Sequence, residues 1–159
     1  MDLQVEIFIK RANNEFLAAE SLKKLSEGAK LKEEFKIPQD TTFYSAVISH
    51  SYYAIFYAAK AFLLSKSIPL KSNQGQHQQV YFEFRKLVQG GEIEKELLRI
   101  YEENKLKAEV LLDILKSEKD KRTDFTYETI PQANKIPADE SLNNALIFLS
   151  HIQGFLKDK

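Results

Sequence analysis

Histidine and its polar neighbours give this chain its first candidates for chemistry. His50 lies in the run Ser49-His50-Ser51-Tyr52-Tyr53, within a stretch that is nearly free of charge. Two interpretations of His50 are open: a core side chain that hydrogen-bonds a backbone carbonyl or a tyrosine hydroxyl, or a base or ligand contact. Buried polar groups usually have structural hydrogen-bond partners, which favours the first interpretation.

Four tyrosines, Tyr44, Tyr52, Tyr53 and Tyr57, mark the same stretch. We expect them mainly to pack in the core or at an interface, with hydroxyls that reach polar partners. Stacking on a nucleic-acid base is the alternative, because every base offers a flat π face to an aromatic ring.

A second candidate region follows the charge run over 119–122. Cations at this point suit the carbonyl-rich end of a helix. Arg122, Asp124 and Tyr127 then come close together in the sequence. An arginine that is held by a carboxylate still offers donors to a phosphate, so we take these three residues as candidates for binding.

The usual motifs of metal and phosphate sites are missing. The chain has no cysteine, and its glycines form no phosphate-cradling loop. His50, His77 and His151 fall on three different predicted elements, and no carboxylate occurs over 42–67. We therefore expect no metal and no cofactor. The formal net charge is zero, so nucleic-acid binding would need a local basic patch.

Apolar residues recur every three or four positions along most of the chain, which predicts helices, and no segment alternates as a half-buried strand does. Pro69 and the pair Gly90-Gly91 interrupt the pattern. The expected helices span 3–28, 42–67, 77–89, 92–121 and 139–156, with an ordered, non-helical connection over 122–137.

Asp40 or Thr41 is expected to cap the second helix, and Asp139 the last one. The second helix is apolar on all sides, as a helix at the centre of a bundle is. These features predict an all-α fold in one domain, residues 1–159, in which about five helices form a bundle around the second helix.

Residues 46–64 also have to be weighed as a membrane span, because 19 residues with one charge, Lys60, approach the length that crosses a bilayer. Ser49, His50 and Ser51 are polar, and aromatic residues crowd the middle of the segment. We therefore interpret it as a buried core helix. The first residues do not resemble a signal peptide, and the absence of cysteine fits a reducing compartment, so a cytoplasmic protein without a membrane anchor is expected.

Three stretches of the sequence resemble the HEPN domain family of small helical proteins. Residues 45–64, with their Tyr-Tyr-Ala core and alanine-rich continuation, are similar to the family's long second helix. Residues 67–69 (Ser-Ile-Pro), followed by His77, resemble its loop and the histidine that opens the next helix. Residues 122–125 (Arg-Thr-Asp-Phe) are similar to its signature before the final helix, so the resemblance covers nearly the whole chain.

The resemblance implies an up-and-down bundle that often forms a homodimer, and often a nucleotidyltransferase partner in a toxin–antitoxin pair. Active members are metal-independent ribonucleases with an arginine that is followed, a few residues later, by a histidine. None of Arg11, Arg85, Arg99 and Arg122 has a histidine at that distance, and Tyr127 lies where one is expected after Arg122. Tyrosine, with an unperturbed pKa of about 10, is a poor base near neutral pH.

Three functions stay open. The first is a non-catalytic or weakly active HEPN-like protein that binds a nucleotide, RNA or a nucleotidyltransferase-type partner. The second is a metal-independent endoribonuclease that uses Arg122 with Asp124, Tyr127, His50 or His77. The third is a structural helical dimerisation module. The candidate binding residues are Arg122, Asp124, Tyr127, Tyr53 and His77.

Overall fold

The computed structural model describes residues 2–71, 75–120 and 135–158, and over 112–120 it describes the backbone alone. The fold is all-α, with no strand in these ranges. The helices are α1 (Leu3–Glu27), α2 (Ala29–Glu34), α3 (Tyr44–Ser65), α4 (Gln76–Gln89), α5 (Lys95–Asp120) and α7 (Lys135–Lys157).

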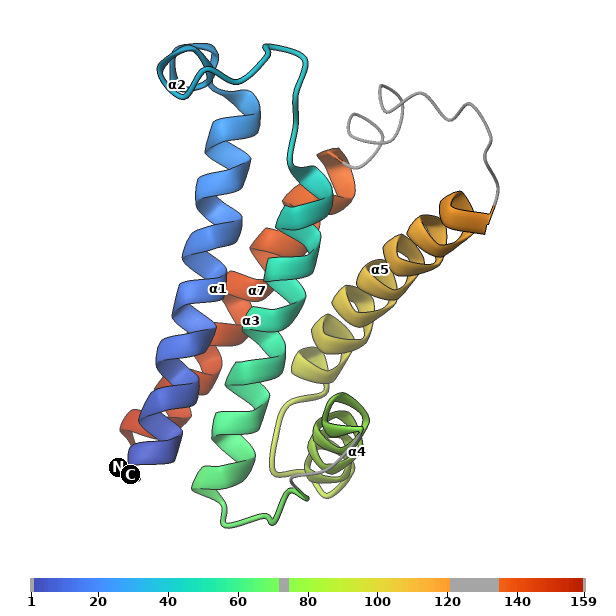
Figure 1. Cartoon of the computed structure of the whole chain (residues 1–159). Helices are drawn as coiled ribbons and strands as arrows, with labels where there is room; N and C mark the ends of the chain where they lie inside the picture. Colours follow the sequence, from blue (N-terminus) through green and yellow to red (C-terminus); the bar gives the residue numbers. More distant parts are fainter. Residues whose placement is uncertain (1, 72–74, 121–134, 159) are drawn as a thin grey trace.

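Helix α3 contacts α1, α4, α5 and α7, and Figure 1 shows it between α1 and α5 with α7 behind. It buries residues on nearly every side, including the fully enclosed Ile48, Ile55 and Leu63. A helix with an apolar surface all round is stable in water only when other helices cover it. The nearly uncharged stretch over 46–64 is therefore the helix on which the others pack.

Aromatic rings from three other helices join the core beside α3. Phe84 of α4, Tyr101 of α5 and Phe148 of α7 are all fully buried. Their ring centroids lie 5.4 to 6.0 Å apart, in tilted or edge-to-face arrangements. Such pairs add to the stability that burial alone gives. This cluster fixes α4 and α5 against the α3–α7 pair.

The expected count of five helices is wrong for the described residues, which contain six, because residues 29–34 form the short helix α2. The segment is charged and has no clear apolar stripe. Lys32 is buried, and its ammonium donates to the Gln39 carbonyl at 2.8 Å. The Gln39 side chain returns a hydrogen bond to the Ala29 carbonyl at 3.1 Å. These polar contacts fold the segment back on itself.

Both expected helix caps differ from the structure. Helix α3 begins at Tyr44 with Phe43 as its N-cap, and no side chain caps it. The Phe43 amide instead donates to the Ser26 hydroxyl at 2.8 Å. Helix α7 begins at Lys135 rather than near Asp139, whose carboxylate pairs with Lys23 on α1 at 3.0 Å. A tertiary partner, Ser26, thus meets the chain at the start of α3, and Asp139 lies within α7 rather than at its N-terminus.

Most of the non-helical connection expected over 122–137 lies outside the described residues. Its last three residues, Lys135, Ile136 and Pro137, are described and are helical, so the expectation is wrong for them. Proline suits the first turn of a helix, because the backbone amides of that turn have no intrahelical hydrogen-bond acceptor and its missing amide hydrogen costs nothing there. Of the helices that the structure describes, none is both long and apolar enough to cross a membrane.

Candidate ligand-binding site

His77, at the start of α4, is packed against the aromatic residues of α3. Its ring stacks on Phe56 at a centroid distance of 4.0 Å and an interplanar angle of 14°. The Tyr53 ring meets it edge-on at 5.6 Å. The Tyr52 hydroxyl lies 2.9 Å from His77 Nδ1. Gly75, with a φ of 85°, precedes α4 in the left-handed region that glycine adopts without strain, and so it directs this turn toward α3.

The protonation of this cluster follows from its burial. Burial lowers the pKa of His77 below its usual value, and the nearby Lys60 ammonium lowers it further. Burial, with a smaller effect of the Glu109 carboxylate, raises the pKa of Tyr52 well above its ordinary range. At neutral pH His77 is therefore a neutral imidazole and Tyr52 a neutral phenol. When the phenol donates to Nδ1, the ring proton lies on Nε2.

A pocket of about 270 Å³ opens beside this cluster. Ser49, Tyr52 and Tyr53 of α3, His77 of α4, and Ala108 and Glu109 of α5 line it. Its volume is below the roughly 300–1,000 Å³ of pockets for drug-sized ligands, so it suits a single small ring. Tyr53 is 39% exposed, which leaves part of its ring free for a ligand. The Glu109 carboxylate at the rim pairs with Lys105 at 3.2 Å.

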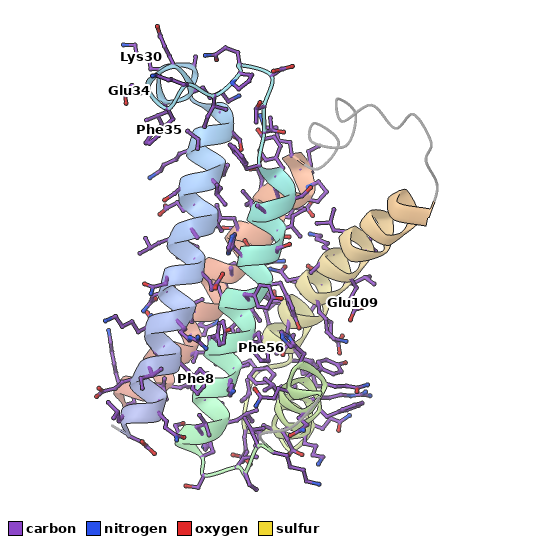
Figure 2. The ribbon with its side chains drawn as sticks, viewed as in Figure 1. Phe8, Lys30, Glu34, Phe35, Phe56 and Glu109 are labelled. Carbon is purple, nitrogen blue, oxygen red and sulfur yellow. The ribbon has the colours of Figure 1, made fainter. Side chains whose placement is uncertain are left out.

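Two cations lie next to the aromatic cluster on the α1 side. The Arg11 guanidinium sits over the Tyr57 ring, 5.2 Å from its centroid, and Tyr57 in turn stacks with Tyr53 at 6.4 Å. The Lys60 ammonium lies 4.3 Å from the Phe8 ring centroid and donates to the Gln76 side chain at 2.8 Å. Figure 2 shows Phe8 on α1 and Phe56 on α3 in the same lower half of the bundle.

His50 has a partner that the sequence did not indicate. Its Nδ1 lies 2.5 Å from a carboxylate oxygen of Glu15 on α1. The side chains of His50 and Glu15 are both partly exposed. The expected core histidine bonded to a carbonyl or a tyrosine hydroxyl is therefore wrong. A carboxylate that holds one ring nitrogen orients the imidazole and leaves the other nitrogen available.

The structure brings together two of the residues expected to bind a ligand, Tyr53 and His77. His50 precedes Tyr53 by one turn of α3, on the side toward α1. Arg122, Asp124 and Tyr127 lie outside the described residues.

The expectation that tyrosine hydroxyls reach polar partners is confirmed for two residues in this region. The Tyr52 hydroxyl meets His77, and the Tyr44 hydroxyl donates to Glu27 at 3.4 Å. The Tyr52, Tyr53 and Tyr57 rings pack against other rings of the α3 surface. Tyr53, the most exposed of these four tyrosines, keeps the alternative role of stacking on a ligand.

Sequence reasoning missed four residues around the site: Arg11, Glu15, Lys60 and Glu109. A partial signal existed for Lys60, the single charge in an apolar helix, and for Arg11, which follows Phe8 of the α1 stripe by three residues. Glu15 and Glu109 gave no such signal, because only the packing of α1 and α5 on α3 brings them near.

In the described part of the chain, no group of three or more histidine, aspartate and glutamate side chains is arranged to hold a metal ion. The candidate site is an aromatic pocket with the Glu109 carboxylate in its lining, and two cations, Arg11 and Lys60, lie next to the aromatic cluster. Comparison with family models, with curated proteins and with solved structures found no match to this chain.

Proposed function

We propose that this chain is a HEPN-like helical protein, inactive or weakly active as an enzyme, that binds a nucleotide or an RNA base in the pocket between Tyr53 and His77. The observation that carries the proposal is the partly exposed Tyr53 ring, held at the mouth of a pocket for one small ring. The similarity of residues 45–64 to the family's second helix agrees with this assignment.

A base is the ligand that this surface fits best. Each base has a π face, and stacking on an aromatic side chain contributes about 1–3 kcal/mol per base. Tyr53 contacts the rings of Tyr52, Tyr57 and His77, so it is held in place before a ligand arrives. A preorganised side chain loses little conformational entropy on binding. The Glu109 carboxylate at the rim offers an acceptor to an exocyclic amino group.

The test is a titration of the four nucleoside 5′-monophosphates and of short single-stranded RNAs, followed by amide NMR spectra or calorimetry. Loss of stacking in Tyr53→Ala is expected to weaken binding roughly 5- to 150-fold. Phe35→Ala is the matched control, because Phe35 is an exposed aromatic residue, 66% accessible, that lies beside α2 at the opposite end of the bundle in Figure 2. Equal binding by both variants and the parent chain would refute the proposal.

Metal-independent endoribonuclease activity is the second candidate, and the Glu15–His50 pair favours it. A carboxylate-held histidine is the arrangement of a general base, which here would take the proton of a ribose 2′-hydroxyl. Purified protein incubated with mixed RNA and a chelator tests this role. RNA that stays as intact as with His50→Ala and Arg122→Ala variants would rule it out.

The proposal includes three further properties. The resemblance implies that the chain is an up-and-down bundle that forms a homodimer, and that it pairs with a nucleotidyltransferase-type protein in a toxin–antitoxin system. The lack of cysteine and of signal-peptide features supports work in the cytoplasm. A purely structural dimerisation module would dimerise without binding nucleotides. Light scattering at micromolar concentration tests the dimer, and a monomer of 18.4 kDa would contradict it.

A further inference from the structure

Arg11 and Lys60 form a pair of like charges that no carboxylate neutralises among the described residues. Arg11 contacts the Tyr57 ring, and Lys60 contacts Gln76 and the Phe8 ring. Burial lowers the pKa of Lys60, and the nearby Arg11 charge lowers it further. Three lysines of this bundle do reach carboxylates on neighbouring elements, in the pairs Lys23–Asp139, Lys66–Glu92 and Lys107–Glu140.

The carboxylate nearest to Arg11 along α1 is held by another residue. Glu15 lies four positions after Arg11, a spacing at which helix side chains can pair, although an acid that precedes the base pairs better. Its carboxylate contacts His50 at 2.5 Å. Within the part of the chain that the structure describes, the Arg11 guanidinium, at an exposed position of α1, therefore has no carboxylate partner.

Neither cation belongs to the residues that line the aromatic pocket, but side-chain contacts connect both of them to it. Lys60 holds the side chain of Gln76, the residue directly before His77, and its charge acts on the His77 ring. Arg11 reaches the pocket through Tyr57, which stacks on Tyr53. The ring of a ligand that stacks on Tyr53 therefore contacts aromatic side chains, and a group attached to that ring can extend toward the two cations.

We propose that Arg11 and Lys60 bind the phosphate of the ligand, so that the site selects a phosphorylated nucleoside over the bare nucleoside. The inference rests on the proposed function. A guanidinium offers parallel donors to phosphate oxygens, and an ammonium adds a mobile point charge. The bound phosphate would also relieve the repulsion between the two cations. The ligand is then oriented, with its base at Tyr53 and its phosphate toward α1.

The experiment compares adenosine with adenosine 5′-monophosphate, and inorganic phosphate alone, by calorimetry at two salt concentrations. The parent chain is expected to bind the monophosphate roughly tenfold or more tightly than adenosine, since hydrogen bonds to charged groups are among the stronger ones. Added salt is expected to remove most of that advantage and to leave adenosine binding unchanged.

Substitutions assign the effect to the two residues. Arg11→Gln and Lys60→Gln are expected to abolish the advantage of the monophosphate while adenosine binds as before, and Lys60→Arg to retain it. Lys10→Gln, which removes the exposed neighbouring charge on α1, is the control. Thermal melts by circular dichroism verify that each variant is folded.

The outcomes separate the inference from the proposed function. Equal affinities of adenosine and its monophosphate, or equal losses in Lys10→Gln and Arg11→Gln, would overturn the phosphate site and leave base binding standing. Phosphate binding that depends on Arg11 and Lys60, without any binding of adenosine, would uphold the cation site and refute the base pocket. No binding of any of the three probes would refute both.

Discussion

Replacing either of two buried tyrosines, Tyr52 or Tyr101, by phenylalanine should change the stability of the protein differently in the two cases. The Tyr52 hydroxyl is 2.9 Å from His77 Nδ1. The Tyr101 hydroxyl is fully enclosed, and it has no hydrogen-bond partner in the described part of the chain. The two rings also touch each other, with centroids 6.4 Å apart. Phenylalanine in either place keeps the ring and removes the hydroxyl alone.

The expected magnitudes follow from these partners. Tyr52→Phe removes a hydrogen bond whose net contribution to the free energy of unfolding is about 0.5–1.5 kcal/mol. For a chain of this size, a loss of about 1 kcal/mol lowers Tm by roughly 2–4 °C. Tyr101→Phe removes an enclosed polar group that lacks a partner, and such a group costs about 1–3 kcal/mol. That variant should be as stable as the parent chain or more stable.

Thermal and urea unfolding followed by circular dichroism measure both changes. Nitrogen chemical shifts of the His77 ring give an independent reading, since Tyr52→Phe removes the group that fixes which ring nitrogen carries the proton. Tyr101→Phe should leave those shifts nearly unchanged. The reasoning is refuted if Tyr101→Phe is less stable than the parent chain, or if the His77 shifts do not respond to Tyr52→Phe.

Two further predictions concern the histidines. Because the pKa of His77 is lower in the folded chain than in the unfolded chain, the unfolded chain takes up a proton first as pH falls. The contribution of His77 to the free energy of unfolding is therefore present above the unfolded pKa, near 6.5, and is lost as pH falls toward the folded pKa. Urea unfolding between pH 8 and 5 should show a smaller loss of stability in His77→Gln than in the parent chain, and an equal loss would contradict the assignment. His50→Ala should free Glu15 to pair with Arg11, and so weaken the binding of adenosine 5′-monophosphate in calorimetry. The double variant His50→Ala, Glu15→Gln should bind the monophosphate as tightly as the parent chain does. If the double variant binds it as weakly as the single variant, Glu15 is not the cause.

The helical fold could be predicted from the sequence because its signals are local. The helix expected over 42–67 matches α3 to within two residues at each end, and the stripe through Val5, Phe8 and Ala12 predicted α1. Helix α2 was not predicted, because a segment of six charged and apolar residues is too short to show a helical periodicity. Asp139 was misjudged because its partner, Lys23, is distant in the sequence.

The candidate site was predictable in its residue types and not in its contacts. Tyr53 was a candidate because an aromatic ring can stack on a base, and His77 because it matches the histidine that opens the next helix in the HEPN resemblance. Nothing in the sequence indicated that His77 would stack on Phe56, or that Glu15 would reach His50 across 35 positions. Such contacts depend on the rotation and offset of packed helices, which residue patterns do not determine.

The central position of α3 has a consequence for how the protein opens. A segment covered by four other helices exchanges its amide hydrogens slowly, because its hydrogen bonds break only when most of the bundle comes apart. Tyr52, Tyr53, Phe56, Tyr57 and Lys60 all belong to this segment. The α3 part of the candidate site therefore stays in place during partial openings of the outer helices, whereas His77 of α4 and Glu109 of α5 move with those helices. A ligand that contacts both parts stabilises the closed form against such openings.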